Sequence, residues 1–192
     1  STLVRDGGTL QIGIGSMGDA LTAALLARQA DNEGYRALLA DLQVDYWQPL
    51  IDREGGVEPF AQGLYGCSEM FVNGLLALAD AGIVRRKVYP TVALQEQANA
   101  GTLDPDSAVG GVSIHGGFFL GPRSFYQRLR ELPKSRLAQF NMTAISYINE
   151  LYGHEELKRL QRRDARFINS AFTMTLMLSL IHISEPTRQE AI

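Results

Sequence analysis

TLQIGIGSMGD, residues Thr9–Asp19, joins a strand-like run to the start of a helical pattern through a glycine-rich turn. Thr9–Ile14 is a short strand-like run. Asp19–Gln29 (DALTAALLARQ) then has apolar residues at helical spacing, with Asp19 placed to favour a helix N-terminus. A strand, a tight turn and a helix in this order are typical of the first unit of a parallel sheet, so this stretch favours α/β architecture.

Strand and helix signals continue to alternate along the rest of the chain. The stretch 31–62 is harder to interpret, because a helix-like run at 36–42 and an apolar run at 47–51 are followed by a Gly-Gly break, and we interpret it as an insertion. The remaining predictions are helices at 71–81 (ended by Gly82), 123–132 and 155–163, a loop at 88–111, and strands at 63–67, 112–120, either 137–140 or 144–148, and 166–173. The sequence therefore predicts an α/β fold with a mostly parallel, Rossmann-like sheet flanked by helices.

Composition and charge restrict the classes of partner. The 192 residues carry a formal net charge of −3 without long runs of either sign, which gives no electrostatic argument for nucleic acid or an anionic membrane. The single cysteine, Cys67, cannot form an internal disulfide and fits a reducing compartment. No apolar run reaches the roughly 18 residues that cross a bilayer, and no signal peptide opens the chain. We therefore expect a cytoplasmic protein without a nucleic-acid or membrane partner.

The last residues, 178–192 (LSLIHISEPTRQEAI), differ from the rest of the chain. Beyond the first few of them they show neither helical nor strand periodicity, and they resemble the translated adapter sequence that ends some sequencing-derived reading frames. We therefore predict one incomplete domain over residues 1–177 and a non-native tail over 178–192. The same codons after Met177 in an independent assembly of the parent locus would contradict this prediction.

The turn Gly13–Gly18 has the spacing G-x-G-x-x-G, which can hold a pyrophosphate on backbone amides. A dinucleotide-binding fold also needs an acidic residue at the end of the next strand, about 20 residues later. The stretch at that distance, Leu38–Leu42 (LLADL), has a helical pattern, so NAD binding is disfavoured. From spacing alone, a tight turn without a ligand is the favoured interpretation.

Glu69 stands in the stretch Gly66–Met70 (GCSEM), at the predicted end of a strand and just before a predicted helix. Residues in such a place project from the carboxyl edge of a parallel sheet, where ligands usually bind. A single glutamate there is more often a solvated residue or a helix N-terminal charge than a nucleophile. Neither composition nor spacing decides between these interpretations.

Four separated segments resemble the C-terminal region of the acetyl-CoA hydrolase/transferase family, which is of the family I CoA-transferase type. That family has a strand, a GxG turn and a helix, then a strand ending in a T/S-E-M-like triplet, and later a Tyr-bearing helix and an I-N-S-A segment. The order is kept here, and Ser68–Met70 takes the place of the triplet. The segments are TLQIGIGSMGD (9–19), GLYGCSEMFVNGLLALADAGIV (63–84), FLGPRSFYQRLR (119–130) and FINS (167–170).

The resemblance implies a CoA-transferase or an acyl-CoA hydrolase in which Glu69 is the catalytic carboxylate. It implies acyl-CoA and a small carboxylic acid as substrates, with coenzyme A as a substrate and no permanently bound cofactor or metal. It also implies that Asn149 lies near the glutamate, that the Ile14 amide donates to an oxyanion, and that the parent protein can be a homodimer. The glycines that match substrate-contacting backbone in the family are Gly13, Gly15, Gly117 and Gly121.

Two departures from the family pattern bear on activity. The insertions at about 31–62 and 91–110 are absent from the short transferase members. The family's second glycine-rich loop should follow 167–177, where the tail stands instead, and the family's N-terminal domain is missing. We therefore predict that this polypeptide by itself is inactive, even where the parent enzyme is active.

Two other readings of the residues stay open. One is a hydrolase that uses Cys67 or Ser68 as a nucleophile with His115 as its base, although the surrounding residues do not form a G-x-S-x-G elbow. The other is a non-catalytic module that binds CoA or a nucleotide through the GxG turn, with Glu69 as a helix charge. Covalent trapping at Glu69, at Cys67 or at neither residue would separate the three.

Overall fold

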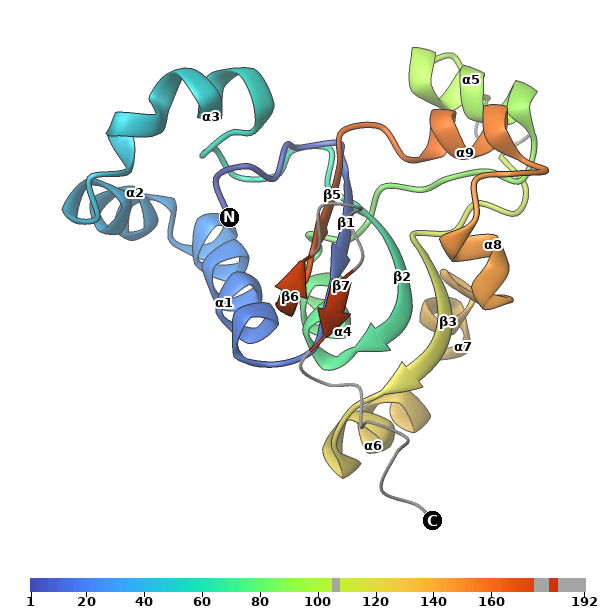
Figure 1. Cartoon of the computed structure of the whole chain (residues 1–192). Coiled ribbons are helices and arrows are strands. Elements are labelled where there is room, and N and C mark those ends of the chain that lie inside the picture. Colours follow the sequence, from blue (N-terminus) through green and yellow to red (C-terminus); the bar gives the residue numbers. More distant parts are fainter. Residues whose placement is uncertain (105–107, 175–179, 183–192) are drawn as a thin grey trace.

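The computed structural model describes residues 1–104, 108–174 and 180–182 of the chain (Figure 1). The strands are β1 (Thr9–Ile12), β2 (Tyr65–Val72), β3 (Ile114–Leu120), β4 (Phe140–Met142), β5 (Ala165–Ile168), β6 (Ala171–Met174) and β7 (Leu180–His182). The helices are α1 (Ser16–Ala30), α2 (Asn32–Asp41), η1 (Val44–Trp47), α3 (Gln48–Glu54), α4 (Asn73–Asp80), α5 (Val92–Ala100), α6 (Arg123–Glu131), α7 (Lys134–Leu137), α8 (Ile145–Asn149) and α9 (Glu155–Gln161).

A five-stranded sheet with the order β4-β3-β2-β1-β5 forms the centre of the molecule, and every pairing in it is parallel (Figure 1). Helices flank this sheet, so the predicted α/β, Rossmann-like fold is confirmed. The chain adds β2, β3 and β4 on one side of β1 and then returns to place β5 on the other side. Strand order therefore reverses at β1, and the carboxyl ends of strands at such a reversal are where ligands bind in open α/β sheets.

Two buried clusters hold the helices on the sheet. The larger cluster joins α1, α4 and α6 to the strands through side chains such as Leu25, Leu75 and Phe125. The smaller cluster joins Tyr65 and Cys67 of β2 to the helix α8. The helical spacing of apolar residues expected at 19–29 corresponds to α1, which buries Leu21 and Leu25.

Strands β1 and β2 pair only at their beginnings, Thr9 with Tyr65 and Leu10 with Gly66. Beyond that point β1 stays paired with β5 as far as Ile12, and β2 stays paired with β3 as far as Val72. The two central strands therefore separate toward their carboxyl ends. This separation positions the functional site described below.

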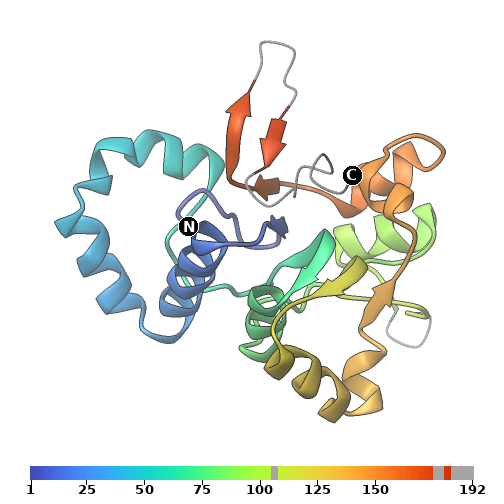
Figure 2. The same cartoon turned by 60° about the horizontal axis from the view of Figure 1, so that its bottom comes forward.

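The segment 31–62, predicted as an insertion, forms an arm of helices α2, η1 and α3 that extends away from the sheet (Figures 1 and 2). The predicted helix 36–42 corresponds to α2, which begins earlier, at Asn32, with the Asp31 side chain accepting a hydrogen bond from the Gly34 amide. The apolar run at 47–51 lies mostly in α3.

The prediction for β2 and α4 was wrong at their boundary. Phe71 and Val72 were expected to start the helix 71–81, but β2 runs from Tyr65 to Val72 and α4 begins only at Asn73. Tertiary packing is the cause: the ring of Phe71 is fully buried, with centroids 5.3 Å from Phe119 and 5.1 Å from Phe140. Glu69 consequently lies within the strand rather than after its end. Gly82 does adopt the left-handed conformation expected of it, with φ 70°.

Three further predictions needed correction. The loop 88–111 contains α5, capped by the Thr91 side chain at its beginning and by left-handed Gly101 at its end. The alternative strand at 144–148 is the helix α8, and the strand lies at Phe140–Met142, near the other alternative. The predicted strand 166–173 is divided into β5 and β6, and β6 pairs antiparallel with β7 in a separate sheet (Figure 2).

The other elements agree with the predictions within a few residues. The strands at 9–14 and 112–120 are β1 and β3, and the helices at 19–29, 123–132 and 155–163 are α1, α6 and α9. Of the tail 178–192, only the backbone of β7 belongs to the described residues, so the prediction of a non-native tail lies mostly outside them. No helix in the described part of the chain is long and apolar enough to cross a membrane.

Candidate active site

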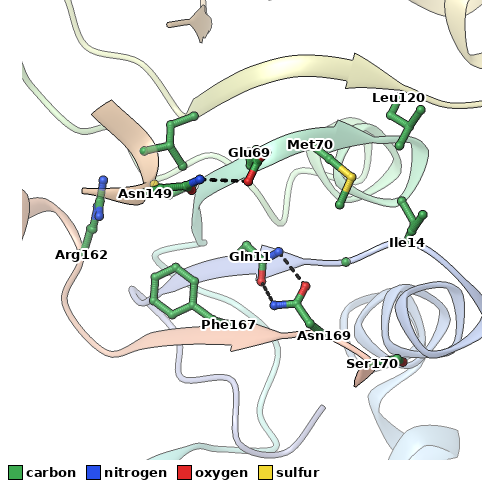
Figure 3. Close-up of a pocket in the computed structure, with 13 residues that line it drawn as sticks. Gln11, Ile14, Glu69, Met70, Leu120, Asn149, Arg162, Phe167, Asn169 and Ser170 are labelled. Carbon is green, nitrogen blue, oxygen red and sulfur yellow. Dashed lines mark hydrogen bonds between the residues drawn. The ribbon is translucent and has the colours of Figure 1, made fainter. Parts of the chain in front are cut away.

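A pocket of about 570 Å³ opens at the carboxyl edge of the sheet, where β1 and β2 separate (Figure 3). The ends of β1 and β5, the middle of β2, and the helix α8 contribute its walls. It therefore lies at the strand-order reversal, where the fold favours a ligand. The lining residues are Gln11, Gly13, Ile14, Cys67, Glu69, Met70, Leu120, Ile148, Asn149, Arg162, Phe167, Asn169 and Ser170.

Glu69 is half-buried in this pocket, on the same face of β2 as Tyr65 and Cys67, because side chains two residues apart share a face of a strand. That face is the one that α8 covers. The Asn149 side-chain amide donates a hydrogen bond of 2.9 Å from Nδ2 to Oε2 of Glu69 (Figure 3). The two predicted catalytic residues, 80 positions apart in the sequence, are thus in direct contact.

The end of the short helix α8 positions Asn149. Ile148 is buried in the smaller cluster and anchors the helix on β2. The backbone oxygen of Tyr147 accepts a hydrogen bond of 3.1 Å from Arg162 Nη2, and that of Glu150 accepts one from the Lys158 ammonium. Cations thus satisfy carbonyls at the helix C-terminus, which is a stabilising arrangement for an exposed helix end.

The glycine turn forms the opposite wall of the pocket. Gly15 has φ 94° and ψ −179°, a conformation that only glycine adopts without strain. A Cβ on Gly13 would lie 2.6 Å from Oδ1 of Asn169, and one on Gly18 would collide with the Gly13 carbonyl, so both glycines permit close backbone approach. Among the described residues, the backbone N–H of Ile14 has no hydrogen-bond partner and can donate to a ligand.

The predicted glycines do not all lie in one place. Gly13 lines the pocket with Ile14, whereas Gly15 and Gly121 line a second, more apolar pocket of about 350 Å³ that shares Gly13, Ile14 and Leu120 with the first. Gly117 lines neither pocket. A Cβ there would lie 2.8 Å from the Glu69 carbonyl oxygen, so Gly117 lets β3 pass close beside the backbone of Glu69.

Four polar residues of the pocket were not predicted as site residues: Gln11, Asn169, Arg162 and Ser170. Gln11 and Asn169 join β1 to the end of β5 through two side-chain hydrogen bonds of 2.9 and 3.0 Å (Figure 3). Arg162 lies directly after α9. Asn169 stands in the FINS segment, which was one of the segments used for the expected resemblance, but nothing in the sequence assigned it a role.

The geometry does not support a Cys–His or Ser–His pair. The His115 imidazole is hydrogen-bonded at Nδ1 to the Tyr65 hydroxyl, 2.7 Å away, and burial lowers the pKa of His115 to about 4. Burial also raises the pKa of the Cys67 thiol. The Ser68 hydroxyl is buried and donates to the Met70 carbonyl. His115 lies opposite Cys67 where β2 pairs with β3, but the hydrogen bond shown for its ring is to Tyr65, so no base already bound to either nucleophile is seen among the described residues.

The arrangement can support acyl chemistry at a carboxylate. A half-buried carboxylate is held by an amide, the Ile14 N–H lacks a partner among the described residues, and Met70, Leu120 and Phe167 form apolar walls. Within the described residues, no three His, Cys, Asp or Glu side chains gather as metal ligands do. No family model, no curated protein and no solved structure matched this chain in the comparisons.

Proposed function

We propose that this chain is the catalytic region of an acyl-CoA:carboxylate CoA-transferase or acyl-CoA hydrolase that works through a glutamyl-CoA thioester on Glu69. The observation that carries the proposal is the contact between Glu69 and Asn149 in a pocket that also contains the glycine turn. A carboxylate at this place in the fold is positioned to meet a ligand rather than to face bulk solvent. The substrates are an acyl-CoA and a small carboxylic acid, and coenzyme A is a substrate rather than a resident cofactor.

The reaction begins when the carboxylate of Glu69 attacks the thioester carbonyl carbon of the acyl-CoA. The carbon–sulfur bond breaks, CoA leaves as its thiolate, and an acyl-glutamyl anhydride remains. The thiolate then attacks Cδ of Glu69, which releases the acid as a carboxylate and leaves a glutamyl-CoA thioester. This is covalent catalysis, in which one difficult displacement is divided into easier ones.

The second half of the cycle runs in the opposite direction. In a transferase, the acceptor carboxylate attacks Cδ of the glutamyl-CoA thioester, CoA leaves as thiolate, and the thiolate takes the acyl group from the new anhydride, which restores the Glu69 carboxylate. In a hydrolase, water attacks Cδ of the glutamyl-CoA thioester. The Glu69 carboxylate is regenerated, and free CoA and a proton are released. The two activities differ in the acceptor that reaches the same intermediate.

The neighbouring groups have distinct roles in this scheme. In this scheme the N–H of Ile14, a pocket-lining residue, donates to the oxyanion that develops on the attacked carbonyl, and a fixed donor of this kind stabilises charge where it forms. The Asn149 amide holds the carboxylate of Glu69 in one orientation. Apolar side chains around the pocket limit hydration of the carboxylate and so favour its attack on carbon.

The proposal includes a cytoplasmic setting, a complete protein with a further domain that closes the pocket, and a homodimer as its assembly. A complete enzyme is expected to turn over, whereas the 192-residue chain alone is expected to be inactive. The single cysteine fits a reducing compartment.

Glu69→Gln in the complete protein that carries this sequence tests the proposal. The substitution is nearly isosteric but removes the nucleophile, so acyl-CoA turnover should fall by at least about 10³-fold while the thermal unfolding midpoint stays unchanged. Glu156→Gln, at an exposed position on α9, is the matched control and should retain full turnover. Full activity of Glu69→Gln would discard the proposal.

A further inference from the structure

Arg162 is the one cation among the described residues that line the pocket, and Glu69 is the one carboxylate there. The two do not form an ion pair in the part of the chain that the structure describes. Asn149 bonds to Glu69 instead, and in Figure 3 it lies between the two charged side chains. Glu69 therefore does not neutralise the positive charge of Arg162 through a direct ion pair.

The guanidinium of Arg162 uses little of its hydrogen-bonding capacity. Nη2 donates to the Tyr147 carbonyl oxygen, 3.1 Å away, and this contact fixes the side chain beside α8. Nε is buried and has no partner among the described residues, the sole buried side-chain nitrogen or oxygen there of which this is true. An arginine has five N–H donors in a rigid fork, and a buried donor left unpaired is unusual in a folded protein. Because Arg162 also lines the pocket, donors of its guanidinium that Tyr147 does not use are available to an acceptor that binds there.

No carboxylate and no second cation from the neighbouring described residues lines the pocket beside Arg162, apart from Glu69 itself. Burial, with the charge of Arg162 as a smaller cause, lowers the pKa of His115 to about 4, so its imidazole is neutral at pH 7. The Lys158 ammonium is directed to the Glu150 carbonyl and to the Tyr147 ring, 4.8 Å from its centroid, and it does not line the pocket. Among the described residues that line the pocket, Arg162 is therefore the one cation available to an anion that enters it.

We propose that the Arg162 guanidinium binds the carboxylate of the small organic acid that exchanges coenzyme A at Glu69. The inference rests on the proposed function, because that reaction brings an anionic acid, as acceptor or as product, next to a site occupied by the carboxylate of Glu69 or its thioester. The carboxylate of the acid and the carboxylate of Glu69 repel each other when both lie in the pocket. A guanidinium fork offsets this repulsion and orients one oxygen of the acid toward Cδ of Glu69. A neutral amide of the same shape as the acid lacks this charge-assisted contact.

Direct binding is tested by nuclear magnetic resonance on the complete protein that carries this sequence. The Nε–H resonance of Arg162, identified by its loss in Arg162→Lys, should shift and saturate as sodium acetate is added. Equal concentrations of acetamide or sodium chloride should leave it in place. An Nε–H resonance that responds equally to chloride and to acetate, or to neither, would overturn the inference.

Kinetics separate substrate binding from a purely structural role at α8. In Arg162→Gln the KM for the acceptor acid should rise at least about tenfold while the KM for acyl-CoA stays within about twofold. Arg162→Lys should recover part of the loss, because it keeps the charge without the fork. The matched control Arg159→Gln, exposed on α9, should change neither constant.

Equal effects of Arg162→Gln on both KM values would assign Arg162 to support of α8 and reject the inference. Failure of the proposed function is a different result. In that case no CoA adduct forms on Glu69, and the acetate titration still decides whether Arg162 binds a carboxylate.

Discussion

The contact between Asn149 and Glu69 joins two residues whose separate roles the sequence left open. A hydrogen bond to an ionised group contributes roughly 1.5–3 kcal/mol, so its loss corresponds to about one to two orders of magnitude in rate if the contact is kept in the transition state. Asn149→Ala should therefore lower kcat/KM for acyl-CoA by about 10–100-fold in the complete protein. Asn149→Asp should be more damaging, because it places a second carboxylate against the first.

Steady-state kinetics with both variants checks this prediction. Asn141→Ala, at an exposed position on β4, is a suitable control and should leave kcat/KM unchanged. Equal rates for Asn149→Ala and the unaltered protein would remove Asn149 from the site.

His115 makes the stability of the fold depend on pH. Its pKa is lowered by burial to about 4 in the folded protein, against 6.5 as its ordinary value. Between these two values the unfolded chain binds a proton that the folded chain does not, so the folded state loses stability as the pH falls through this range. The free energy of unfolding should fall by roughly 2 kcal/mol between pH 7 and pH 5 from this residue alone.

Urea denaturation at a series of pH values measures this dependence. The variant His115→Gln cannot titrate, and its free energy of unfolding should fall less steeply over the same interval. An identical pH slope in the variant would show that other groups account for the effect.

The turn between β1 and α1 is the element on which the pocket wall depends. Gly15→Ala puts a side chain on a backbone at φ 94° and ψ −179°, which should cost about 1–3 kcal/mol and displace the neighbouring Ile14 amide. Gly101→Ala is a matched control, because Gly101 also has a positive φ and open space around it but ends α5 away from the pocket. Urea denaturation should show a loss of stability in both variants.

Acyl-CoA affinity, measured by calorimetric titration, should separate the two glycine variants. It should fall in Gly15→Ala and stay unchanged in Gly101→Ala. Equal affinities in the two would mean that the turn has no part in binding.

Elements with a clear apolar period were predictable from the sequence, and elements defined by long-range packing were not. The helix α6 follows a Gly-Pro start and shows a strong amphipathic pattern, so its bounds agree closely with the prediction. The strand β2 was predicted too short because Phe71 and Val72 suit either state, and partners 48 residues away in β3 decide between them. The helix α5 was missed although Thr91 and Gly101 are good caps, since its polar residues show no apolar stripe.

At the scale of the whole molecule, the site is produced by strand order and by the separation of two strands. Glu69, Ile14 and Asn149 were proposed only through the resemblance inferred from the sequence, because neither composition nor spacing assigned them a role. Gln11 and Asn169 were not proposed, because their contact joins residues 158 positions apart across the reversal at β1. Arg162 was also missed, because it lies between α9 and β5 and its place in the pocket depends on the path of the chain between these two elements.

The glutamyl-CoA thioester is the covalent species whose detection on the complete protein tests the proposed mechanism most directly. After incubation with acyl-CoA and rapid quenching, peptide mass spectrometry should find coenzyme A attached to Glu69 as a thioester. Borohydride should reduce that thioester, and the adduct should be absent in Glu69→Gln. A CoA or acyl label on Cys67, or turnover without any adduct on the peptide that contains Glu69, would contradict the central claim.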